Sequence, residues 1–150
     1  MESIKNIVII YPSFERGGVE NILLNLVNFF CKKKKKIYLI SNINNFKKDQ
    51  HLKNFLIIKK IKKLKKIKGK FNRLILSIYA IKKLRELFKN LSKNETIIYS
   101  MQSNILPIIF TKIYGFKIVI RNSENPVSSL KYSKNKFNSI LTIFFKFLIY

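Results

Sequence analysis

The amino-acid sequence predicts an α/β fold, a Rossmann-like parallel sheet with helices on both faces. Short apolar runs alternate with segments of helical periodicity along the 150 residues, and this alternation is typical of parallel strands connected by helices. The first run, at 7–10, contains only isoleucine and valine, which fits a strand that is covered on both faces. The length predicts about one domain with a real core.

The first strand, at 7–10, is expected to end at Pro12, because proline donates no backbone hydrogen bond. A helix follows from Val19, since apolar residues recur there every three or four positions. They are Val19, Ile22, Leu23, Leu26, Val27 and Phe30. Gly17 and Gly18 precede this helix, and their lack of a side chain lets a ligand approach the main-chain amides. The N–H groups and dipole of the first helical turn favour an anion such as a diphosphate at this position.

The same patterns predict the remaining elements. Strands are expected at 37–40, 55–58, 96–99 and 116–120, the second of them at an edge of the sheet. A helix at 71–91 is expected to bury one stripe, formed by Leu74, Ile75, Ile78, Ile81, Leu84, Leu87 and Phe88. The next helix starts at Ile105, carries Leu106, Ile109, Phe110 and Ile113, and ends at Gly115.

Polar turns follow three of the predicted strands, at 13–20, 100–104 and 121–125. In an open parallel sheet, ligands bind beyond the carboxyl ends of the strands. We therefore expect these turns to be neighbours in space and to form the ligand site, although they are far apart in the sequence.

The chain is strongly basic, with 31 Lys and Arg against 7 Asp and Glu, a net charge of +24. Its hydrophobic content of 47% excludes general disorder. The favoured residues, Lys, Ile, Asn and Phe, all have A/T-rich codons, so a biased genome explains the lysines. Nucleic-acid recognition is disfavoured, because it tends to use arginine forks. The charge should still attract the protein to anionic lipid, and the lysine-rich segment at 59–70 is either a solvated connector or a basic patch lying on such lipid.

Single residues restrict the chemistry further. Cys31 is the only cysteine, which excludes an internal disulfide and leaves no cysteine pair for a metal site, and it is expected to act as a small apolar residue. The only histidine, His51, lies in a polar stretch and is assigned no role. The N-terminus is not a secretory signal, and no apolar run is long enough to cross a bilayer. We expect a cytoplasmic protein, with peripheral contact at the inner membrane face.

Two stretches resemble the N-terminal domain of family 4 glycosyltransferases of the GT-B fold. The first is an apolar strand followed by P-S-F and G-G-V-E, at 7–20. The second contains YSMQSN at 99–104 and YGFKIVIRNSENP at 114–126. Together they cover residues 5 to about 126 in the order that the family has.

This resemblance implies a half of an enzyme. The family transfers a sugar from a nucleotide-diphosphate sugar to an acceptor, with retention at the anomeric carbon. Residues 1–126 would be its acceptor-side Rossmann-like domain, and 127–150 an incomplete helical segment leading to an absent nucleotide-sugar-binding domain. The chain is then expected to be a truncated product that is inactive alone, with unknown catalytic residues. It would need no cofactor, and it would act on a glycan or lipid-linked acceptor, as in polysaccharide biosynthesis.

The resemblance also assigns roles to residues. The donor phosphate would be bound by Gly17, Gly18 and Arg121, and the acceptor by Gln102, Ser103, Asn104 and Glu124. Arg121 stands where several relatives have a histidine, and an arginine cannot act as a general base. It could stabilise phosphate charge or pair with Glu124; the alternative is a surface cation at a strand end. The alternative function for the whole chain is a non-catalytic basic module that binds a membrane surface or polyanions.

Overall fold

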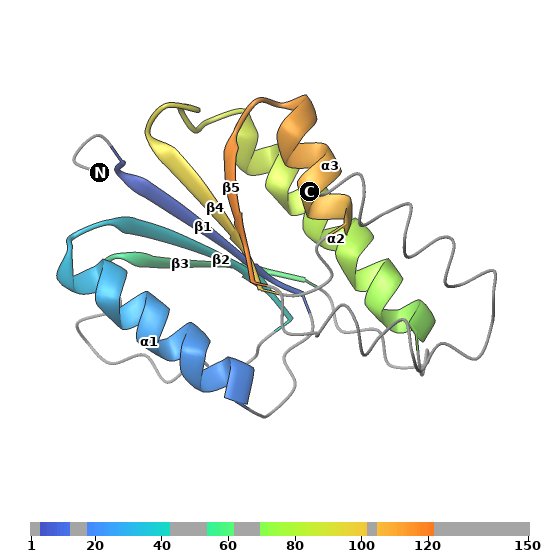
Figure 1. Ribbon diagram of the computed structural model, residues 1–150, viewed down its shortest axis with the longest axis horizontal. Helices are drawn as coiled ribbons and strands as arrows, with labels where there is room; N and C mark the ends of the chain where they lie inside the picture. The colour runs from blue at the N-terminus through green and yellow to red at the C-terminus, as the bar shows by residue number, and fades with distance from the viewer. Residues whose placement is uncertain (1–3, 13–17, 43–53, 62–69, 102–104, 122–150) are drawn as a thin grey trace. The chain divides into compact units, whose positions relative to one another are not determined.

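A computed structural model of the 150-residue chain describes residues 4–12, 18–42, 54–61, 70–101 and 105–121 (Figure 1). Strands and helices alternate as the sequence predicts. In chain order they are β1 (Asn6–Tyr11), α1 (Gly18–Lys32), β2 (Lys36–Ser41), β3 (Leu56–Lys60), α2 (Lys70–Phe88), β4 (Thr96–Ser100), α3 (Ile105–Ile113) and β5 (Lys117–Ile120).

The strands form one parallel sheet in the order β3-β2-β1-β4-β5. Every pair is parallel, and Ile9 at the centre lies opposite Leu39 on one side and Tyr99 on the other. The predicted α/β fold class is therefore confirmed, and so is the position of β3 at an edge. The β3 ladder extends to Ile61, whose amide donates to the carbonyl of Ser41 at 2.9 Å. The start of the lysine-rich segment thus belongs to the sheet, and 62–69 lie outside the described residues.

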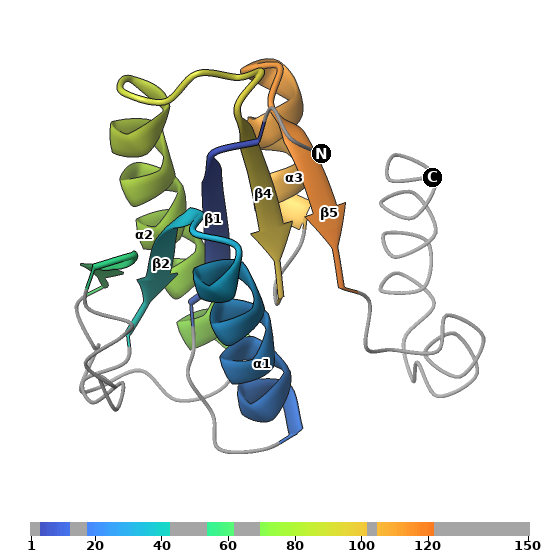
Figure 2. The same ribbon diagram turned by 90° about the vertical axis from the view of Figure 1, so that its left-hand side faces the viewer.

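Helices cover both faces of the sheet, α1 on one and α2 with α3 on the other (Figure 2). Alternate residues of β1 supply the two cores, because successive side chains of a strand point to opposite faces. Ile7, Ile9 and Tyr11 belong to the core under α1, which also contains Leu23 and Val27. The α2 face contains Val8, Ile10, Tyr38, Ile40, Ile98 and the buried residues of α2. Cys31 is buried on the α1 face, as expected of a small apolar residue.

Two helices end in the same hydrogen-bonded cap. After α3, the amide of Phe116 donates to the carbonyl of Thr111 at 3.1 Å and that of Gly115 to Lys112 at 3.0 Å, with Gly115 at φ 71°. This is the Schellman pattern, in which a left-handed residue closes the helix, and it confirms Gly115 as the terminator. After α1, Lys35 and Lys34 make the equivalent bonds, and Lys34 takes the left-handed position at φ 53°.

The buried stripe predicted for α2 is partly wrong. Ile78 is 45% exposed, whereas Leu76 and Ala80, which the prediction left out, are buried together with Leu84. Apolar residues occur all around this helix, so several stripes fit the sequence, and the contacts with the sheet and α3 select one of them. The helix also ends earlier than predicted, at Phe88. The amide of Asn90 then bonds back to the carbonyl of Leu87 at 3.0 Å in a tight turn.

Two other helices show smaller differences from the expected pattern. In α1, Leu23 and Val27 are buried as predicted, but Ile22 is largely exposed. In α3, Ile108 and Thr111 are buried, whereas Ile113 is 73% exposed. Phe110 and Tyr114 lie beside Phe88, whose ring stacks on that of Phe116 with centroids 4.0 Å apart. This aromatic cluster fixes the ends of α2 and α3 against the start of β5.

Substitutions on α2 test which of its faces is buried. Replacing Leu76, which is 2% exposed, by alanine should lower the free energy of unfolding by about 2 to 5 kcal/mol, because it leaves a cavity. The matched change Ile78→Ala should lower the free energy of unfolding by less than about 1 kcal/mol, since nearly half of that residue is already exposed to water. Urea unfolding monitored by circular dichroism measures both values. Equal losses would contradict the described orientation of α2.

Glycine at position 34 should stabilise the protein, because Lys34 holds a backbone conformation that L side chains disfavour. We expect Lys34→Gly to raise the free energy of unfolding by about 1 kcal/mol. Lys33→Gly is the control: its residue is one position earlier and not left-handed, so glycine there should destabilise by about 0.5 to 1 kcal/mol. Thermal unfolding of both variants gives the comparison, and a loss of stability in Lys34→Gly would contradict the described cap.

Candidate functional site

The carboxyl ends of three adjacent strands, β1, β4 and β5, lie at one edge of the sheet. Ile10 is opposite Ser100, and Ser100 is opposite Ile120, so the three strands end at the same level. One residue beyond β4, the amide of Met101 still donates to the carbonyl of Ile10 at 3.0 Å. The three strands that the predicted polar turns follow therefore end side by side.

The direction in which successive strands are added across the sheet reverses between β1 and β4. From β1 it moves outward to β2 and β3, and it then returns to the other side of β1 to form β4 and β5. In open α/β sheets, ligands bind outside the carboxyl ends of the strands at such a reversal. β1 and β4 are the two strands at this reversal, so the chain segments that follow them start at this point of the sheet.

Gly18 is the first residue of α1, and it is exposed. A Cβ atom built on it would meet no atom of the described residues within 4 Å, and its backbone is not left-handed. Neither packing nor backbone conformation therefore requires glycine at this position, in contrast to Gly115 with its positive φ. What glycine leaves at position 18 is open space beside the amides of the first turn of α1, where the dipole favours an anion.

Arg121 directly follows Ile120, the last residue of β5, in the chain. Its side chain is half-buried, and its Nη1 atom is buried. A guanidinium group can bind two oxygens of one phosphate or carboxylate group. The predicted role of Arg121 in binding the donor phosphate stays a prediction.

The other predicted site residues lie outside the part of the chain that the structure describes. They are Gly17, Gln102, Ser103, Asn104 and Glu124. For these residues the structure shows only where the preceding strands end. Their assignment to donor or acceptor remains a prediction.

Hydroxyl-bearing residues end three of the apolar strands at this edge. The sequence placed Ser100 at the start of a predicted ligand turn, whereas Tyr11 and Ser41 received no predicted role. Tyr11, Ser41 and Ser100 are each the last residue of a strand and are buried. Because all three residues are buried, they lie below the solvent-exposed surface of this edge. A polar residue at the end of an apolar run is the sequence signal that could have indicated them.

Two described residues have shifted acid–base equilibria. Burial raises the pKa of the Cys31 thiol and that of the Tyr99 phenol, so both groups stay neutral at pH 7. Both lie on the α1 face, where the rings of Tyr99 and Phe30 are 5.4 Å apart. Neither residue therefore supplies a charged or nucleophilic group at neutral pH.

Two further features are absent from the described part of the chain. No three His, Cys, Asp or Glu side chains there gather closely enough to hold a metal ion. None of the described helices is both long and apolar enough to span a membrane.

Comparison of the chain with protein-family models, curated proteins and solved structures found no match.

The two described glycines should respond in opposite ways to alanine. Gly18→Ala should leave the free energy of unfolding unchanged or raise it by up to about 1 kcal/mol, because alanine favours a helix and meets no neighbour there. Gly115→Ala should lower it by about 1 to 2 kcal/mol, since alanine disfavours a φ of 71°. Chemical denaturation measures both changes. A clear loss of stability in Gly18→Ala would show that position 18 has a structural reason to be glycine.

Proposed function

We propose that this chain contains the acceptor-side half of a retaining glycosyltransferase of family 4 with the GT-B fold. The carboxyl edge at β1 and β4 would bind the diphosphate of a nucleotide-diphosphate sugar and the acceptor. The sugar would pass to an acceptor hydroxyl, and the nucleoside diphosphate would leave with the negative charge that develops in the reaction. The nucleotide itself would be bound mainly by a second, nucleotide-binding domain, as in the family that the motifs resemble.

The observation that carries this proposal is the position of the glycine-containing turn within the strand order. The turn follows β1, the strand at which the order reverses, and it leads directly into the first turn of α1. Many α/β domains contain a strand, a turn and a helix in succession. In open sheets, however, the turn that binds a ligand is the one that follows a strand at the reversal of the strand order. The motifs at 7–20 and 99–126 add the resemblance to the glycosyltransferase family.

The charges of the described residues support a diphosphate at this edge. The first turn of α1 offers unpaired N–H groups, and Gly18 leaves space beside them. Arg121 would stabilise the leaving phosphate, because it keeps its positive charge throughout the reaction. It would not remove a proton from the acceptor, so that step needs another group.

The acceptor would be held by the turn after β4 and the turn after β5. Gln102, Ser103 and Asn104 offer amide and hydroxyl groups that match the hydroxyls of a sugar. Glu124 would accept a hydrogen bond from the acceptor or pair with Arg121. The acceptor class, a glycan or a lipid-linked sugar, and the location in the cytoplasm are parts of the same proposal.

Titration with sugar nucleotides tests the donor site. The amides of Gly18 and Val19 should shift in ¹⁵N-labelled protein when UDP-, GDP- or ADP-sugars are added. The three donors should bind about equally, because the nucleotide itself is bound mainly by the second domain. Gly18→Val should weaken this binding by about tenfold, equivalent to about 1.4 kcal/mol, because the side chain fills the space beside the amides. Nuclear magnetic resonance titration measures both the shifted residues and the affinity.

Two controls separate this site from general attraction to a basic protein. Asn25→Val changes an exposed residue further along α1 and should leave the affinity unchanged. Inorganic pyrophosphate should shift the same two amides, since the diphosphate is the part of the donor that this half would bind. Shifts spread over surface lysines, with no response at Gly18 to any donor, would contradict the proposal.

A further inference from the structure

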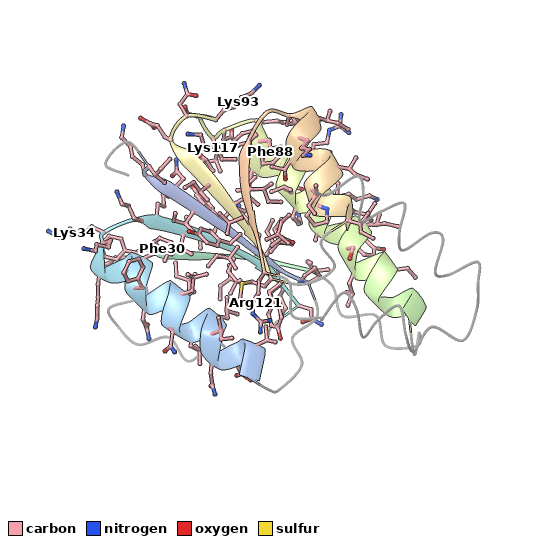
Figure 3. The ribbon with its side chains drawn as sticks, viewed as in Figure 1. Phe30, Lys34, Phe88, Lys93, Lys117 and Arg121 are labelled. Atoms are coloured by element: carbon pink, nitrogen blue, oxygen red, sulfur yellow. The ribbon has the colours of Figure 1, made fainter. Side chains whose placement is uncertain are left out.

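Lysines gather at the amino-terminal edge of the sheet, opposite the candidate site. All strands begin there, and the helices that return to the next strand end there. The lysines are Lys5 before β1, Lys32 to Lys36 between α1 and β2, Lys89 and Lys93 between α2 and β4, and Lys112 and Lys117 around the turn from α3 to β5. All are exposed except the half-buried Lys35. We call this surface the amino-terminal lysine edge; Figure 3 labels Lys34, Lys93 and Lys117 on it.

Little negative charge opposes these lysines. Within the described turns that make up the edge, Glu95 is the one acidic side chain, and it forms an ion pair with Lys5. Glu95 also has a structural role, because its carbonyl accepts the amides of Lys5 and Asn6 at 2.9 Å each. The other lysines, exposed apart from the half-buried Lys35, create a positive field over this edge.

The backbone holds the lysines in place. Lys34 is fixed in the cap of α1, where its amide bonds to the carbonyl of Cys31 at 2.9 Å. The side chain of Lys93 lies over Gly115, with its Nζ 3.6 Å from the position that a Cβ would take. The turn before β4 and the turn before β5 are therefore in contact, and their charges form one surface rather than separate tails.

Exposed apolar side chains accompany this charge. Phe29 in the last turn of α1 is 54% exposed and precedes Lys32 and Lys33 by three and four positions, and Ile113 beside Lys112 is 73% exposed. Lysines next to exposed Phe and aliphatic residues suit the head-group region of a bilayer, where the apolar groups enter the acyl boundary. A nucleic acid fits this surface less well, because it offers no apolar partner to Ile113. The cations of these described turns are also all lysines, whereas nucleic-acid recognition tends to use the two-pronged guanidinium of arginine.

We propose that the amino-terminal lysine edge docks on an anionic lipid bilayer, with Phe29 and Ile113 at the level of the head groups. This docking would leave the carboxyl edge facing away from the lipid. The inference does not depend on the proposed glycosyltransferase function, since it uses the opposite edge of the sheet.

Binding of the full chain to vesicles tests the proposal. At physiological salt it should bind phosphatidylcholine vesicles that contain phosphatidylglycerol, and not vesicles of phosphatidylcholine alone. The triple change Lys34→Gln, Lys93→Gln and Lys117→Gln should weaken this partitioning by about 100-fold, because each lysine at an anionic surface contributes a factor of about 5. Sedimentation with vesicles measures the partition coefficient.

The matched control is Lys59→Gln, Lys60→Gln and Lys82→Gln, which removes the same charge from β3 and from the middle of α2. It should weaken binding by less than about threefold, since these residues lie away from the edge. Ile113→Ser keeps the charge and should weaken binding by about tenfold, because it removes an apolar contact with the bilayer. Thermal unfolding of each variant shows whether it is folded.

Three results would overturn the proposal. The first is absence of binding to the anionic vesicles at physiological salt. The second is an equal effect of the two triple changes, which would indicate that net charge or another segment drives binding. The third is tighter binding of a DNA duplex than of anionic vesicles at the same salt, which would assign the edge to nucleic acid.

Discussion

The structure depends on the parallel pairing of β1 with strands on both of its sides. β1 bonds to β2 on one edge and to β4 on the other, and Val8, Ile9 and Ile10 are completely buried. A strand covered on both faces and paired on both edges has no freedom to shift its register, because a shift by one residue would exchange its two faces. The carboxyl end of β1 is thereby held at the point where the strand order reverses.

This constraint also gives the two edges of the sheet different properties. The carboxyl edge carries Gly18 and the first turn of α1, where the helix dipole favours a small anion. The amino edge combines lysines with exposed apolar side chains, which suits an extended anionic surface. Because every strand runs in the same direction, each edge collects turns from several parts of the chain.

The fold could be predicted from the sequence because its strands are β-branched apolar runs and its helices are separated by glycine and polar turns. The buried face of α2 could not, since apolar residues surround that helix and only tertiary contacts select Leu76 over Ile78. Of the candidate site, the sequence predicted that the strands before the polar turns run in parallel, so that their carboxyl ends share one edge. It could not show the left-handed backbone of Lys34 or the gathering of lysines from separate turns, because both follow from three-dimensional contacts.

Both edges of the sheet follow from the position of β1 between β2 and β4, parallel to both. Amide-to-amide and Hα-to-amide nuclear Overhauser effects across the strands measure this directly. The structure predicts parallel patterns that connect the Ile9 region to Leu39 and, on the other side, to Tyr99. Antiparallel patterns, or contacts of β1 with only one neighbouring strand, would contradict this strand order. The carboxyl ends of β1 and β4 would then not lie side by side.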